Sequence, residues 1–298
     1  MQTRLTTAAA AVTALTAMLA FVPAHANPNW DSVGEALGKK GAELPGGVYR
    51  VGLPRSDLKV TLDGVAIKPA LAPGSWLAFQ AMGDSAMVMG DLVLTQDEVS
   101  PVMKRLAEGG IEITALHNHL LRAEPMTMYM HVEGHGDPVK MAEELHAALA
   151  LSKTPMGQSG GSGAAQTVDL DTAALDKALG HAGKANGGVY QFSIPRAESP
   201  TDGGIGIPTS MGTAIAINFQ PTDGGKAAIT GDFVLIASEV NPVLQALREN
   251  GIEVTAIHNH MLNDQPHLFF MHFWANDDAG KLARGLKAAL DKVNLAKS

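Results

Sequence analysis

The sequence contains no cysteine among its 298 residues. Disulfide bonds, thiolate nucleophiles and cysteine-ligated zinc or iron–sulfur sites are therefore excluded, and any metal must be held by histidine, carboxylate or methionine. Positive charge is also scarce, because 22 Lys and Arg residues face 30 Asp and Glu residues and give a formal net charge of −8 at pH 7. This balance disfavours nucleic acid and acidic membrane surfaces as partners.

Long apolar runs are absent beyond the first 26 residues. The chain starts with a short positive segment, Met1–Arg4, continues with an Ala-rich apolar run over residues 8–22, and then reaches Ala24-His25-Ala26. These are the three parts of a secretory signal peptide, and the apolar run is short for a membrane span. We therefore expect residues 1–26 to be removed on export, which leaves a periplasmic or secreted protein without a membrane anchor.

An internal repeat dominates the rest of the sequence. Residues 111–119 return almost unchanged as residues 252–260, an offset of 141, and Pro54-Arg55 returns as Pro195-Arg196 at the same offset. Such self-similarity indicates a duplicated unit, although it leaves open whether the copies are separate or intertwined. The predicted parts are a first copy over 30–153, a Gly- and Ser-rich linker over 154–168, and a second copy over 169–298.

The patterns inside each copy predict an α+β fold. Thr95 and Glu98 form a candidate capping box for a helix that ends at Gly109-Gly110, and a closing helix is clearest in the second copy. Strands without regular βαβ alternation favour a mostly antiparallel sheet with two or so packed helices in each copy. The strands expected in the first copy cover residues 48–53, 60–67, 76–80, 86–94, 111–119 and 126–132.

Three histidines occur at matching places in both copies. His117 and His119 are two residues apart on a predicted strand, so they point to one face, the face of Ile113 and Ala115. His131 joins them if the next strand pairs back antiparallel in a suitable register. The candidate metal ligands are therefore His117, His119 and His131 in the first copy and His258, His260 and His272 in the second.

This set of donors predicts a divalent transition metal in each copy. Three neutral imidazoles with an open fourth position suit zinc first and copper second. Glu124 is the nearest candidate general base, and it makes the first copy the tighter site, because the second copy has Gln265 there. The two unequal sites would serve metal handling or metal-assisted hydrolysis, and whether the protein is an enzyme stays open.

A second interpretation treats the histidines as core or pocket residues of a non-enzymatic envelope module that binds a small molecule or supports structure. A histidine at the end of a buried strand often only bonds a backbone carbonyl. Two further repeated motifs carry weaker signals. We expect Asp91 and Asp232 to lie in turns; the alternative is that each carboxylate orients a histidine. We expect Arg55 and Arg196 to form surface ion pairs; the alternative is that they clamp an anion. The oligomeric state is left open.

The paired histidine blocks also resemble a known family. Residues 114–120 and 255–261, together with Met130-His131 and residues 270–274, are similar to a bacterial family of unknown function that includes the mycobacterial lipoproteins LppY and LpqO. No lipobox cysteine follows the apolar run here, so a free soluble form is expected in place of a lipid-anchored one. The resemblance implies membership and no activity.

Overall fold

The structure is a computed structural model that describes residues 28–157 and 167–297. The predicted signal peptide over residues 1–26 lies outside the described residues, and so does much of the predicted linker. Among the described helices, none is long and apolar enough to cross a membrane.

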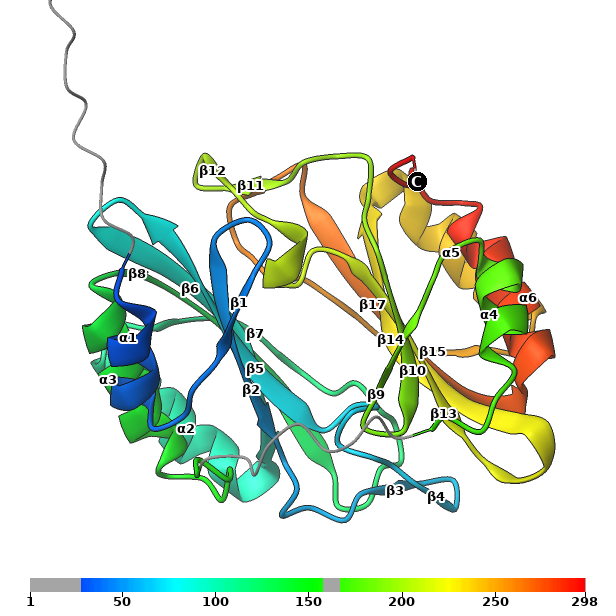
Figure 1. The fold of residues 1–298 in the computed structure, drawn as a ribbon, viewed down its shortest axis with the longest axis horizontal. Coiled ribbons are helices and arrows are strands. Elements are labelled where there is room, and N and C mark those ends of the chain that lie inside the picture. The colour runs from blue at the N-terminus through cyan, green and yellow to red at the C-terminus, as the bar shows by residue number, and fades with distance from the viewer. Residues whose placement is uncertain (1–27, 158–166, 298) are drawn as a thin grey trace, which may run out of the picture.

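The first copy forms a six-stranded antiparallel sheet with three helices (Figure 1). Its helices are α1 (Trp30–Leu37), α2 (Gln96–Glu108) and α3 (Pro138–Leu149). Its strands, in their order across the sheet, are β1 (Ala42–Leu44), β2 (Val48–Pro54), β5 (Gly74–Met82), β6 (Ser85–Thr95), β8 (Thr127–Gly136) and β7 (Glu112–His117).

The second copy repeats this order. Its helices are α4 (Thr172–Leu179), α5 (Ala237–Glu249) and α6 (Ala279–Leu290). Its strands, in the same order across the sheet, are β9 (Lys184–Asn186), β10 (Val189–Ile194), β13 (Ile215–Pro221), β14 (Lys226–Ile236), β17 (Leu268–Asp278) and β15 (Glu253–His258). The predicted α+β fold of two similar halves is confirmed, with three helices in each half.

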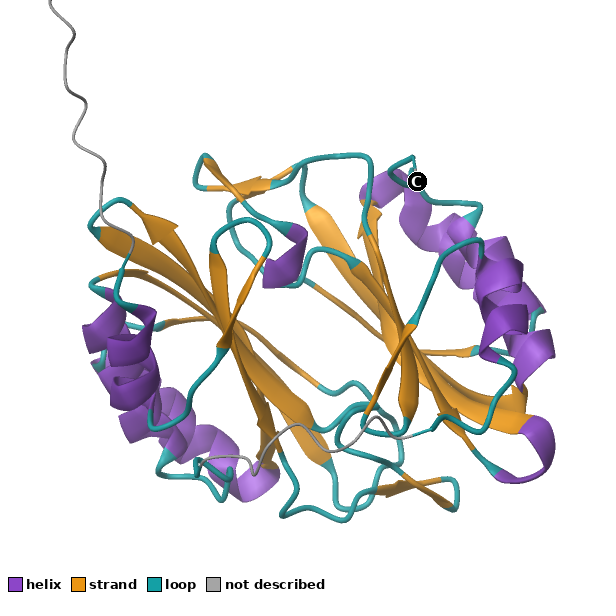
Figure 2. Cartoon of the chain, viewed as in Figure 1, coloured by secondary structure: helices purple, strands orange, loops and turns teal. Residues whose placement is uncertain are grey.

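The two sheets face each other, and the helices cover their outer faces (Figure 2). Alternation along the strands decides which side chains face the helices. In β6, Leu92 and Leu94 point outward and join a buried apolar cluster with Val102 and Leu106 of α2. Asp91, between Leu92 and Gly90 on the same strand, belongs to the inner face. Polar residues such as Asp91 therefore lie in the space between the inner faces of the two sheets.

Short segments cross from each half to the other. One carries the hairpin of β3 (Thr61–Leu62) and β4 (Val65–Ala66), and the other carries β11 (Thr201–Asp202), β12 (Ile205–Gly206) and the turn η1 (Thr209–Met211). Gln80 Nε2 donates to the Gly206 carbonyl at 3.2 Å, and Gln220 Nε2 donates to the Ala66 carbonyl at 2.8 Å. The halves therefore hold each other through equivalent, reciprocal bonds.

Some expected elements differ in detail. The predicted strand over residues 60–67 is a hairpin, because Asp63 and Gly64 turn the chain with positive φ values of 49° and 81°. The predicted strand over residues 111–119 ends at His117. Helices α1 and α4 were not expected, since each has only eight residues and a short apolar pattern.

The predicted surface position of Arg55 and Arg196 is wrong. Arg55 is fully buried, and its NH1 donates to Glu98 at 2.8 Å and to the Val93 carbonyl at 2.7 Å. Glu98 also accepts the Thr95 N–H, as the capping box predicted. Arg196 makes the same bonds in the second copy. Each arginine thus ties the first turn of a helix to the neighbouring strand and is no anion clamp.

Replacing Arg55 by Met should lower the free energy of unfolding by about 3 kcal/mol, because Glu98 would stay buried without its cation. Urea unfolding followed by circular dichroism measures this loss. Lys104→Ala is the control, since Lys104 pairs with Glu108 on the exposed face of the same helix, and its midpoint should stay close to that of the wild type. A similar midpoint for both variants would contradict a structural role for Arg55.

Candidate metal centre

A β-bulge turns the end of β7 toward the inner face. Ile113 lies opposite Val132 of β8, but Ala115 lies opposite His131, so Thr114 is one residue in excess. Such a bulge shifts the alternation of side chains by one. Ile113 therefore packs against the helix-facing core, whereas Ala115 and His117 lie on the inner face with His131. The expectation that His117 shares a face with Ile113 is wrong for this reason.

The second copy has the same bulge at Thr255. The two bulge threonines bind across the interface, because Thr114 Oγ1 donates to the His260 carbonyl and Thr255 Oγ1 donates to the His119 carbonyl, both at 2.6 Å. Each bulge therefore fixes the backbone of the histidine segment that belongs to the other half.

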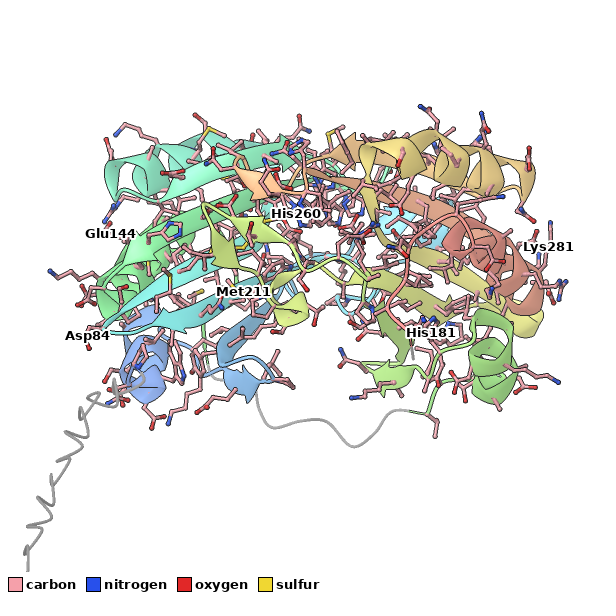
Figure 3. All side chains as sticks on the ribbon, turned by 90° about the horizontal axis from the view of Figure 1, so that it is seen from above. Asp84, Glu144, His181, Met211, His260 and Lys281 are labelled. Atoms are coloured by element: carbon pink, nitrogen blue, oxygen red, sulfur yellow. The ribbon has the colours of Figure 1, made fainter. Side chains whose placement is uncertain are left out.

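The six repeated histidines meet in one cluster between the sheets, which we call the histidine cluster. It consists of His117, His119, His131, His258, His260 and His272. Ring centroids lie 3.5 Å apart for His117 and His258, 3.7 Å for His119 and His272, and 3.8 Å for His131 and His260. Figure 3 shows the labelled His260 between the two halves. The copies therefore do not carry the two separate sites that we expected.

The cluster contains three overlapping groups of three whose ligand atoms all lie within 4.8 Å of one another. One group is the predicted set of the first copy, His117, His119 and His131. The other two combine both copies: His117 with His258 and His272, and His131 with His258 and His260. The predicted set of the second copy is not among the groups found in the described residues.

The Nε2 atoms of the histidine cluster lack hydrogen bonds. The Nε2 atom of every member is buried without a hydrogen bond in the described structure, and so are Oδ1 of Asp91 and Oδ1 of Asp232. His272 Nδ1 lies 2.7 Å from the Gly231 carbonyl, which favours the tautomer that leaves the Nε2 lone pair free. Most buried polar atoms in proteins are bonded. A purely structural role leaves these atoms unexplained, whereas a bound cation would take several of the nitrogens as ligands.

Two aspartates flank the cluster in the middle of β6 and β14. Asp91 Oδ2 lies 3.4 Å from His119 Nε2, and Asp232 Oδ2 lies 3.3 Å from His260 Nε2. The prediction that these residues lie in turns is therefore wrong. The alternative, that each carboxylate lies beside a histidine, describes their position. Glycine precedes each one because the strands approach closely there: a Cβ at Gly231 would lie 1.9 Å from the Ala216 carbonyl oxygen.

Burial changes the proton affinity of these groups. It lowers the pKa of His272 to about 3, although the charge of Asp232 opposes the change. Burial and the neighbouring imidazoles hold the pKa of His119 well below its ordinary value. Burial, reinforced by Asp232, raises the pKa of Asp91 to about 8. The imidazoles are thus neutral at pH 7, the form that binds metals, and at Asp91 burial outweighs the opposing charge of Arg50.

Glu124 is not part of this centre. Its side chain is exposed, and its backbone pairs with Thr61 of the crossing hairpin. The structure therefore does not bring the expected general base to the histidines.

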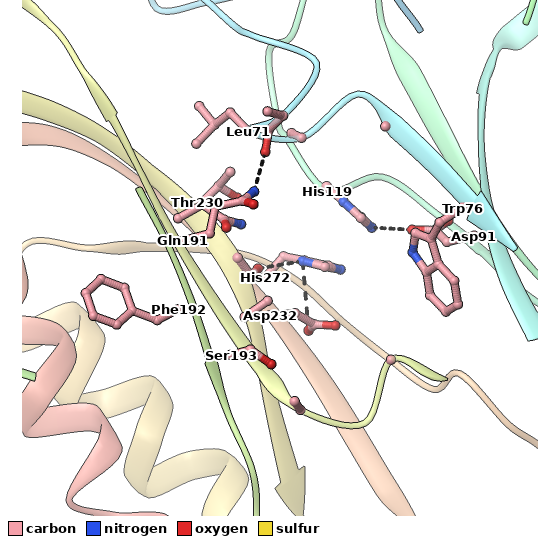
Figure 4. Close-up of a pocket in the computed structure, with 18 of the residues that line it drawn as sticks. Leu71, Trp76, Asp91, His119, Gln191, Phe192, Ser193, Thr230, Asp232 and His272 are labelled. Carbon is pink, nitrogen blue, oxygen red and sulfur yellow. Dashed lines mark hydrogen bonds and ion pairs between the residues drawn. The ribbon is translucent and has the colours of Figure 1, made fainter. Parts of the chain in front are cut away.

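A cavity of about 560 Å³ adjoins the cluster between the sheets (Figure 4). His119, His131, His260 and His272 line it together with both aspartates. Arg50, Trp76 and Gln191 also line it, and none of them stood out in the sequence. The sequence does carry a signal for a buried site at Asp91, since a carboxylate inside an apolar strand needs a partner.

The chain belongs to the family described as Domain of Unknown Function (DUF1259), whose model matches it twice, over residues 31–151 and 173–292. The match establishes the family and the duplication. The narrower resemblance to LppY and LpqO stays a prediction. A comparison with curated proteins finds no match.

Two solved structures are similar to the chain at a low level. A trimeric bacterial microcompartment shell protein, PduB, is 11% identical with a TM-score of 0.24 and covers 87% of this chain and 96% of its own. EtuB from Clostridium kluyveri is 9% identical with a TM-score of 0.22 and covers 85% of this chain and 90% of its own. TM-scores this low carry no argument about function.

The metal-free protein should lose stability as the pH falls from 6.5 toward 5. In this window the histidines of the unfolded state bind protons, whereas the buried histidines of the folded state do not. Each histidine therefore lowers the free energy of unfolding by up to about 1.4 kcal/mol per pH unit. The raised pKa of Asp91 acts in the opposite direction, because the folded state then binds the proton, but the histidines outnumber the aspartates. Urea unfolding in EDTA at several pH values measures the balance. Stability that stays level or rises on acidification would contradict neutral, buried histidines.

Proposed function

We propose that the protein binds one divalent transition metal ion at the histidine cluster, zinc first and copper second. The observation that carries the proposal is a cluster of six histidines whose buried Nε2 atoms make no hydrogen bond and whose ligand atoms form three overlapping groups of three. Imidazole nitrogens suit zinc and copper, and structures with three protein ligands leave a position for water or substrate.

The arrangement favours one ion shared by both copies over one ion in each. Every pair of the three histidine groups shares a member, so no two groups can each hold an ion with ligands of its own. His117, His131 and His258 each belong to two groups, which makes them the central ligands. Asp91 and Asp232 would balance the charge of the ion and orient the outer histidines.

The adjoining cavity supports a role that includes a second ligand beside the metal. Open space next to a metal ion admits a water molecule or a substrate, as metal-assisted hydrolysis requires. Metal handling needs no such space. Whether the metal catalyses a reaction is separate from the proposal that it binds, and export to the periplasm or medium is part of the proposal.

Protein produced without a histidine tag and exported should contain one zinc ion per chain by elemental analysis. After removal of the metal, calorimetric titration with zinc should show one step. His117→Ala and His258→Ala come from different copies, yet each should weaken that same step, because each substitution breaks two of the three groups of ligands and leaves one.

His181→Ala is the control, since His181 lies away from the cluster (Figure 3), and it should bind zinc as the wild type does. Circular dichroism checks that each variant folds. Two independent steps, each removed by one variant only, would overturn the shared site, and folded wild type without any zinc affinity would overturn the metal proposal.

A further inference from the structure

The cavity beside the histidine cluster differs at its two ends, although the two halves around it are copies. Ladder pairing identifies equivalent positions: Trp76 lies opposite Asp91, and Ala216 lies opposite Asp232. A tryptophan in one half thus corresponds to an alanine in the other. The missing indole leaves open space on the second sheet, where Ser193, Asn218 and Thr230 supply polar lining.

Arg50 and Gln191 are a second pair of equivalent residues that differ. Arg50 NH1 donates to the Ser210 carbonyl at 2.7 Å, and Gln191 Nε2 donates to the Ala70 carbonyl at 2.8 Å. Both bonds hold the segment that crosses from the other half. Because glutamine makes this bond in one half, the bond alone does not require arginine in the other.

The Arg50 guanidinium makes no other hydrogen bond within the described residues. It stacks on Trp76, with 4.2 Å from Cζ to the ring centroid. Ser210 is its one hydrogen-bond partner among the described residues, and it forms no ion pair within 4.0 Å there. Burial lowers the pKa of Arg50 to about 10, although the charge of Asp91 opposes the change, so the group stays charged at neutral pH. A charge in this setting needs an anion or water.

The shape of the Arg50 guanidinium selects the anion, because its planar set of N–H donors pairs bidentately with a planar carboxylate. Inorganic phosphate, which a guanidinium also binds, is the competing anion in the test. Arg50 on β2 lies three strands from His131 on β8, roughly 14 Å at ordinary strand spacing, so the side chains and a small ligand together can span the distance.

We propose that the cavity binds a small organic acid with a single carboxylate, which pairs with Arg50 while hydroxyl or carbonyl groups of the acid face Ser193, Asn218 and the metal. The metal end of this proposal rests on the proposed function, whereas the carboxylate end rests on Arg50. The cavity volume of about 560 Å³ lies in the range of small-molecule sites.

The test uses the full exported chain loaded with zinc. Lactate and gluconate are the probes, and their uncharged counterparts lactamide and sorbitol are the matched controls, together with inorganic phosphate. Calorimetry should show binding of at least one of the two acids and none of its uncharged counterpart. Arg50→Gln reproduces the residue of the other half and keeps its carbonyl bond, so it should fold, keep its zinc and bind the acid about 10- to 100-fold more weakly.

A second variant, Ala216→Phe, should fill the open end and block the acid while Arg50 stays in place. Zinc content is measured on every sample, so the two proposals fail separately. Absence of zinc in the wild type contradicts the metal site. The carboxylate site is overturned if the zinc-loaded protein binds neither acid, binds the uncharged counterparts equally well, or binds phosphate more tightly. An Arg50→Gln variant with unchanged affinity for the acid would overturn it as well.

Discussion

The reciprocal bonds between the bulges at Thr114 and Thr255 and the histidine segments of the opposite halves hold the inner faces together. Each bulge does two things at once. It reverses the alternation of its strand, so that apolar residues face the helices before it and histidines face the interface after it. It also presents a hydroxyl to the other half. Without this device, His117 would point to the helix-facing core and the histidine cluster could not form.

Duplication accounts for the symmetry of the histidine cluster, and later divergence of the two copies accounts for the asymmetry of the cavity beside it. The histidines, the aspartates, the bulges and the crossing segments are equivalent in the two halves, which suits a site on the axis between them. The differences lie beside the axis, where Arg50 and Trp76 face Gln191 and Ala216. A further difference is that buried Glu133, whose pKa burial and Asp202 raise to about 8, corresponds to buried Trp274. A symmetric histidine cluster beside an asymmetric cavity follows from this history.

Local patterns in the sequence predicted the local structure. The repeat, the strands around Val48 and Ala86 and the helix capped at Thr95 all follow from short-range periodicity and capping chemistry. The bulges did not, because a threonine inside a β-branched run looks the same whether it pairs or protrudes. Packing of the two histidine sets into one cluster depends on contacts more than a hundred residues apart, which leave no local trace. Burial of Arg55 was missed for the same reason, since its partner Glu98 lies 43 residues away.

The central claim is that one metal ion is held by histidines of both copies. Anomalous diffraction at the zinc edge, from crystals of the zinc-loaded protein, tests it most directly. The account predicts a single strong peak between the two sheets, within bonding distance of Nε2 atoms from both halves. Two peaks, each bonded to histidines of one half alone, or a peak remote from the histidine cluster, would contradict it.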